Sequence, residues 1–160
     1  DSVLHIRMEY KPHTRDGQKL WYKSGIVRSY ESIKYGYFEA RVKGASKFPG
    51  VCPAFWAKGH KNGESAEIDF MEIQEVQNNI HQIDCNLHAH PIINGERKEI
   101  HQRRHWIADW DPRDDFHIYG CEWNKDSIKW FIDGKHVLSA PNNYWDLPMD
   151  VMASMAIRPP

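Results

Sequence analysis

The sequence has no long hydrophobic run, no excess of charge of one sign and few cysteines, and each absence excludes a class of protein. Every apolar segment is shorter than the ~18 residues that a membrane-spanning helix needs. The 21 basic and 22 acidic residues leave a formal net charge of -1. A nucleic-acid-binding domain normally carries a basic patch or stripe. We therefore expect neither a membrane span nor a nucleic-acid partner.

The three cysteines, Cys52, Cys85 and Cys121, allow at most one internal disulfide. None of them belongs to a CxxC pair, so the sequence gives no sign of a structural zinc or thiol redox motif. Cys85 and Cys121 both lie in strand-like runs and could form a bridge. The alternative is that all three are buried thiols that behave as small hydrophobic side chains.

What the sequence does contain is a single-domain length of 160 residues and many ring side chains. Seven Trp, seven Tyr and ten His are present. We therefore predict one domain over residues 1–160. Aromatic rings in a polar chain can provide surfaces that stack on flat ligands such as sugars, or they can fill the core of a β-sandwich.

The hydrophobic pattern predicts strands throughout and no helix. The run 35–43 alternates with period two, which is typical of a half-buried strand. Asp133-Gly134 predicts a hairpin between runs 127–132 and 135–138. Further strands are expected over residues 3–9, 67–75 and 150–157, and a long polar loop over 91–115. Many short strands with regular turns predict an all-β fold, an antiparallel sandwich or barrel.

One predicted strand carries three carboxylates in six residues, from Glu67 through Asp69 to Glu72. In a regular strand Glu67 and Asp69 share a face, and Glu72 lies on the opposite face. One β-bulge near Met71 would return Glu72 to the face of the other two. The same shift would let Ile68, Phe70 and Ile73 pack inward.

Three clustered carboxylates repel one another, so a role in chemistry is favoured. Two carboxyl groups about 5–5.5 Å apart are what a retaining glycosidase needs, and Asp69 between them would influence how they share protons. Two other interpretations remain open, a solvated acidic strand face and a calcium site. Calcium is usually bound by a flexible loop, and this segment is apolar and strand-like.

The segment Glu67-Ile68-Asp69-Phe70-Met71-Glu72 resembles the E-x-D-x-x-E signature of glycoside hydrolase family 16, in its bulge-containing form. The runs 35–43, 49–56 and 116–134 are similar to three further family motifs in the same order. Cys52 stands where many members have Trp. The resemblance implies a concanavalin-like jelly-roll, which is an antiparallel β-sandwich, with a substrate cleft across its concave face.

The resemblance also implies roles for individual residues. Glu67 would be the nucleophile, Asp69 its assistant and Glu72 the acid/base. Trp56 would be a sugar platform, and His88 would face the substrate from a neighbouring strand. Because Glu72 must stay protonated beside an ionised Glu67, the pH–rate curve should be bell-shaped.

Three loop residues are weaker substrate-binding candidates. Trp110 could line the cleft or fix its loop onto the sandwich, and Trp145 is a candidate sugar contact. Arg104 belongs to a basic stretch that could bind sulfate esters or only solvate the loop. His88 and His90 form an HxH pair, half of a metal site. No third ligand stands at a matching spacing, so we predict no metal at this pair and no required cofactor; a structural calcium ion is an open alternative that the sequence assigns to no residue.

The expected function is endo-hydrolysis of a polysaccharide with retention, on a red-algal galactan of the agar, porphyran or carrageenan type. The alternatives are a laminarinase-type β-1,3-glucanase, a transglycosylase and a non-catalytic, lectin-like binding module. The first residues carry no signal-peptide pattern, so the compartment follows from function. We expect a monomer that is secreted, periplasmic or held at the outer surface.

Overall fold

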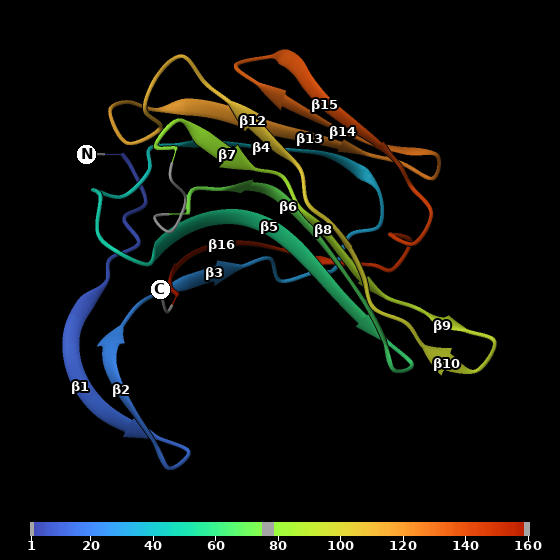
Figure 1. Cartoon of the computed structure of the whole chain (residues 1–160), viewed down its shortest axis with the longest axis horizontal. Coiled ribbons are helices and arrows are strands. Elements are labelled where there is room, and N and C mark those ends of the chain that lie inside the picture. The colour runs from blue at the N-terminus through green and yellow to red at the C-terminus, as the bar shows by residue number, and fades with distance from the viewer. Residues whose placement is uncertain (1, 75–78, 159–160) are drawn as a thin grey trace.

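The computed structural model describes residues 2–74 and 79–158. The described residues form strands and no helix, so they include no helical segment that could cross a membrane. Two antiparallel sheets stack on each other, and two hairpins project from them (Figure 1). This is the antiparallel β-sandwich that the alternating pattern predicted.

The larger sheet has eight strands. Its main order is β11-β8-β6-β5-β16-β3, and β7 continues from β6 to β12. The strands are β3 (Ile26–Arg28), β5 (Val51–Lys61), β6 (Glu64–Glu72), β7 (Gln82–Asp84), β8 (Leu87–His90), β11 (Ile100–Gln102), β12 (His105–Ile107) and β16 (Asp150–Ile157).

The smaller sheet has the order β15-β14-β13-β4. Its strands are β4 (Gly36–Val42), β13 (His117–Trp123), β14 (Ser127–Ile132) and β15 (Lys135–Pro141). The predicted hairpin is confirmed, since β14 pairs antiparallel with β15 across Asp133-Gly134. Asp133 and Gly134 both have positive φ, 49° and 76°, as a two-residue hairpin turn requires.

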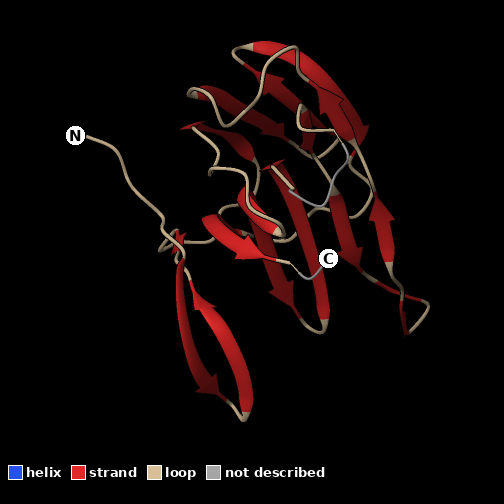
Figure 2. Ribbon diagram, turned by 60° about the vertical axis from the view of Figure 1, so that its left-hand side comes forward, coloured by secondary structure: helices blue, strands red, loops and turns tan. Residues whose placement is uncertain are grey.

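Two hairpins lie outside these sheets, β1 (Glu9–Arg15) with β2 (Gln18–Lys23), and β9 (Ile92–Ile93) with β10 (Glu96–Arg97). The larger sheet is curved, and the smaller sheet covers its convex side (Figure 1). The two hairpins project beyond opposite ends of the concave side. Figure 2 shows the β1–β2 hairpin standing away from the two sheets.

Parts of the strand prediction were wrong. The expected loop over 91–115 contains β9, β10, β11 and β12, because β9 and β10 pair with each other while β11 and β12 pair with β8 and β7 of the larger sheet. The expected strand over 3–9 begins only at Glu9; Val3 and Leu4 line a cavity instead. Within the expected strand 67–75, residue 75 lies outside the described residues.

The core lies between the two sheets. The larger sheet contributes Ile68, Phe70 and Leu87, and the smaller sheet contributes Trp123 and Trp130, all at most 2% exposed. The three cysteines are also buried and free. Cys85 and Cys121 are therefore small core residues that form no bridge, whereas Cys52 is buried beside Glu72.

Candidate active site

The β-bulge in β6 brings the three carboxylates to one face. Asp69 pairs with Trp56 of β5 and Met71 pairs with Phe55, so Phe70 has no partner between them. The extra residue lies next to the predicted position, Met71. Phe70 is 2% exposed and packs in the core. Glu67, Asp69 and Glu72 therefore occupy the concave face of the larger sheet.

Glu67 is the most accessible of the three. Its carboxylate lies 2.7 Å from the Lys58 ammonium on β5, and its side chain keeps 21% of its surface exposed. His88 of β8 is its partner on the other side. A carboxylate whose charge is stabilised by a neighbouring ammonium, and which solvent can reach, is suited to act as a nucleophile.

Asp69 is buried between the two glutamates. Its Oδ2 lies 3.4 Å from His88 Nε2, and no described residue donates a hydrogen bond to this oxygen. Burial, together with the negative charges of Glu72 and Glu67, raises the pKa of Asp69 to about 7, and the nearby His88 opposes this. In turn, Asp69 raises the pKa of His88. The protonation of the two groups is coupled, because the charged form of each favours the charged form of the other.

Glu72 is 5% exposed and is surrounded by donors. Its Oε2 accepts from Gln74 Nε2 at 3.3 Å and from Asn86 Nδ2 at 3.4 Å. Its Oε1 accepts from the Arg158 guanidinium and lies 3.7 Å from Cys52 Sγ. The side chain is therefore held in one orientation toward the concave face.

Two tryptophans hold the backbone of β6 in place from the core side of the sheet. Trp130 Nε1 donates to the carbonyl oxygen of Asp69 at 2.9 Å. Trp145 Nε1 donates to the carbonyl oxygens of Glu67 and His88 at 2.9 and 3.0 Å. The prediction that Trp145 contacts sugar is wrong, because its side chain is fully buried. It positions the backbone that carries Glu67.

The other predicted site residues divide into two groups. Trp56 and His88 lie on the concave face beside Asp69 and Glu67, and Trp56 Nε1 donates to Ser154 Oγ at 3.0 Å. Trp110 stacks on His117 of the smaller sheet, with ring centroids 3.4 Å apart. Arg104 donates to the carbonyl oxygen of Ser139 on β15. Trp110 and Arg104 therefore contact the smaller sheet, on the side away from the carboxylates, and hold the ends of β12 onto it.

Two cationic side chains at the site were missed, Lys58 and Arg158. Lys58 could have been found from the sequence, because it lies two residues after Trp56 in the same strand and therefore faces the same side as Trp56. Arg158 had none. It follows β16, and only the pairing of β16 with β5 carries it next to Cys52 and Glu72.

Two groups of side chains among the described residues could hold a metal ion. One is Glu67, Asp69 and His88, and the other is His90, Glu99 and His101. In each, one ligand atom per residue lies within 4.8 Å of the others. The first group is the carboxylate site itself, where Lys58 already neutralises Glu67.

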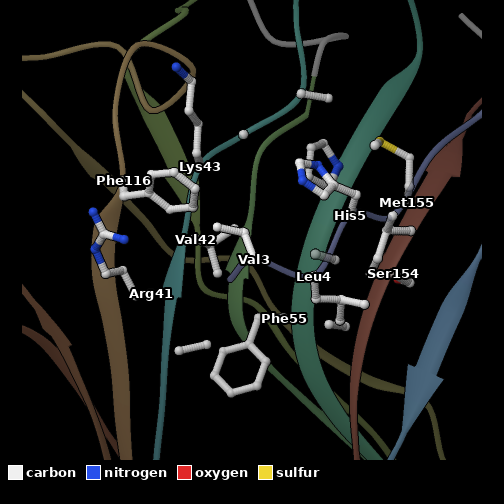
Figure 3. A pocket seen from close by; sticks show the side chains of 17 residues that line it. Val3, Leu4, His5, Arg41, Val42, Lys43, Phe55, Phe116, Ser154 and Met155 are labelled. Carbon is white, nitrogen blue, oxygen red and sulfur yellow. The ribbon is translucent and has the colours of Figure 1, made fainter. Parts of the chain in front are cut away.

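A cavity of about 530 Å³ lies elsewhere, between the N-terminal segment, β4, β5 and β16. Figure 3 shows Val3, Leu4, Phe55 and Met155 around it. Its lining contains His5 but no carboxylate, so it lacks the pair of carboxyl groups that a retaining glycosidase uses. The three carboxylates lie on the concave face of the larger sheet instead.

Comparison with known proteins agrees with this geometry. The family described as "Glycosyl hydrolases family 16" matches residues 2–157. The kappa-carrageenase of Pseudoalteromonas carrageenovora is 37% identical over 156 residues, which covers 88% of this chain and 39% of that protein. A beta-glucanase of Acetivibrio thermocellus is 28% identical over 153 residues, 96% of this chain and 41% of that protein.

Among solved structures, a kappa-carrageenase of Zobellia galactanivorans superposes with a TM-score of 0.80 at 40% identity, over 92% of this chain and 60% of that one. The chain thus spans about two fifths of the length of these two sequence relatives and three fifths of this solved chain.

Proposed function

Because the chain belongs to glycosyl hydrolase family 16, we propose that it is the catalytic part of a retaining endo-β-glycosidase that cleaves a sulfated red-algal galactan. The observation that carries the catalytic proposal is the bulge at Phe70, which places Glu67, Asp69 and Glu72 on one open face. A sugar-binding module would not need three carboxylates that repel one another. Since a polysaccharide does not enter cells intact, we expect the protein to act outside the cytoplasm.

In the proposed reaction Glu67 attacks the anomeric carbon while Glu72 donates a proton to the departing glycosidic oxygen. The bond to that oxygen breaks, and a glycosyl ester with Glu67 forms. Glu72, now a carboxylate, takes a proton from water, which attacks the same carbon and releases Glu67. Asp69, held beside Glu67, adjusts the protonation of the pair.

Arg158 supports a sulfated substrate. In the free protein its guanidinium binds Glu72, and its side chain remains 45% exposed. A guanidinium matches the geometry of a sulfate ester in two parallel hydrogen bonds. A sulfate that takes over Arg158 would free Glu72 to carry the proton that an acid needs. The small Cys52 side chain leaves space for this guanidinium; a Trp at the same position would be far larger.

The resemblance to kappa-carrageenases supports the same class of substrate. We therefore expect activity on carrageenans and related galactans, little on laminarin, and a first product that keeps the β-anomer. New reducing ends across a panel of agarose, porphyran, carrageenans and laminarin measure the first two. Proton NMR of the first-formed product measures the third. Activity on laminarin alone would contradict the substrate, and an α-anomer would contradict the mechanism.

Arg158→Ala is expected to lower the ratio of kcat/KM on a sulfated galactan to kcat/KM on its desulfated form. A charge-assisted hydrogen bond contributes about 1.5–3 kcal/mol, so the ratio should fall on the order of tenfold or more. The control is Arg41→Ala, which removes an arginine that packs on Phe116 from the smaller sheet. An equal fall on both substrates would mean that Arg158 serves only Glu72.

A further inference from the structure

A second cluster, formed by histidine side chains and one glutamate, lies at the edge of the larger sheet. β8 carries His88 and His90, two residues apart, so both rings project from the same face. His101 of β11 pairs with His88, and Glu99 lies two residues before His101. The neighbouring strand therefore supplies the further ligands that the HxH pair lacked in the sequence.

The contacts bring three of these side chains together. His101 Nε2 lies 2.6 Å from Glu99 Oε1, and the rings of His90 and His101 are 5.8 Å apart at 83°. His90 Nδ1 lies 3.1 Å from Ser65 Oγ, which leaves Nε2 as the free ligand atom of that ring. A hydrogen-bond partner on the second nitrogen is what orients metal-binding histidines.

We propose that His90, Glu99 and His101 bind a divalent transition-metal ion of the Zn²⁺ class. Two imidazoles and one carboxylate form a common ligand set for zinc, with water in the fourth position. Calcium and magnesium prefer oxygen ligands alone. An exposed His–Glu ion pair by itself would have little significance. The third ligand and the Ser65 contact distinguish this cluster from such a pair.

The protonation states suit metal binding. Burial and the charge of Arg97 lower the pKa of His90, which favours its neutral ring. The hydrogen bond from His101 lowers the pKa of Glu99, which favours the carboxylate. At neutral pH both groups are in the form that binds a metal, and the ion would replace the proton between His101 and Glu99. Arg97 and, more weakly, Lys58 are nearby positive charges that oppose a cation.

The ligand atoms must draw closer. Bonds of about 2.0–2.1 Å in a tetrahedral site place neighbouring ligand atoms roughly 3.4 Å apart, and in the empty cluster they lie within 4.8 Å of one another. The side chains of His101 and Glu99 are 41% and 71% exposed, so they can rotate without disturbing the core. An ion there would lie on the face that carries Glu67, next to His88.

Titration with Co²⁺ and Zn²⁺ tests the site without any assay of hydrolysis. We expect one ion per chain by calorimetry and the intense visible absorption of four-coordinate Co²⁺. His101→Ala, His90→Ala and Glu99→Gln should each weaken binding at least about tenfold. His136→Ala, on the smaller sheet, should bind as the unmodified protein does. Circular dichroism establishes that each variant folds; Glu99 is exposed, so its variant should fold even if another does not.

Two outcomes would overturn the proposal. One is that the unmodified protein shows no site-bound Co²⁺ spectrum. The other is that Glu99→Gln binds normally while Glu67→Gln does not, which would place the ion at Glu67, Asp69 and His88. Neither outcome depends on whether the protein hydrolyses a galactan, so this test and that of the proposed function can fail separately.

Discussion

Glu67→Gln is expected to reduce kcat on the galactan on the order of 10⁴-fold or more, since loss of a covalent nucleophile removes the proposed pathway. The amide keeps the shape of the side chain but cannot form the glycosyl ester. Glu67 is partly exposed, and its contact with Lys58 is an ion pair between side chains. The variant should therefore keep the fold. Reducing-end assays measure the loss, and circular dichroism measures the fold.

A control is available on the same strand. Glu64 begins β6, and its Oε1 accepts from the backbone N–H of Ile92 at 2.8 Å. Glu64→Gln keeps this acceptor and removes one charge, so its turnover should remain near that of the unmodified protein. Near-normal turnover in Glu67→Gln would exclude Glu67 as the nucleophile.

The roles of the two glutamates can also be separated. Glu72→Gln should lose about 10²–10⁴-fold on the polysaccharide, because the departing oxygen is no longer protonated. An aryl glycoside with an acidic phenol needs no such proton, so Glu72→Gln should still release the phenol in a first burst. Glu67→Gln should release none. The reverse pattern would exchange the two roles.

The strand pattern and the bulge could be predicted because both are local. Period-two alternation over 35–43 follows from which side chains meet the core, and it agrees with Phe38 and Ala40 packing inward in β4. The position of the bulge follows from Ile68, Phe70 and Ile73, since all three can be buried only if the strand shifts by one residue.

The errors arose where pairing between distant segments decides the structure. Trp145 was predicted as a sugar contact because it follows Asn142-Asn143 in a polar segment. In the fold its indole N–H satisfies two carbonyl oxygens behind β6 and β8, a contact that no local pattern contains. Arg158 reaches Glu72 from 86 residues away in the sequence. His101 meets His90 only because β11 joins the edge of β8.

Asp69→Asn is expected to change how stability depends on pH. In the folded protein the pKa of Asp69 is about 7, against an ordinary value of 3.8. The folded state therefore binds more protons than the unfolded chain between these two values, and stability falls as pH rises through them. His88, whose pKa is also raised, adds a further fall above its ordinary value of 6.5. The amide at position 69 cannot titrate, and it lacks the negative charge that favours protonated His88. The stability of the variant should therefore fall less steeply as pH rises.

Three pKa units correspond to at most about 4 kcal/mol, and a domain of this size changes Tm by roughly 2–4 °C per kcal/mol. We subtract the Tm of the unmodified protein from that of Asp69→Asn at each pH. This difference should be higher at about pH 8 than at about pH 4.5, by on the order of 5–10 °C. Asp146→Asn, at an exposed loop position, should follow the unmodified protein at both pH values. If Asp69→Asn also followed it, the carboxyl of Asp69 would have to be ionised throughout, and it could not share a proton with His88 or adjust the protonation of Glu67.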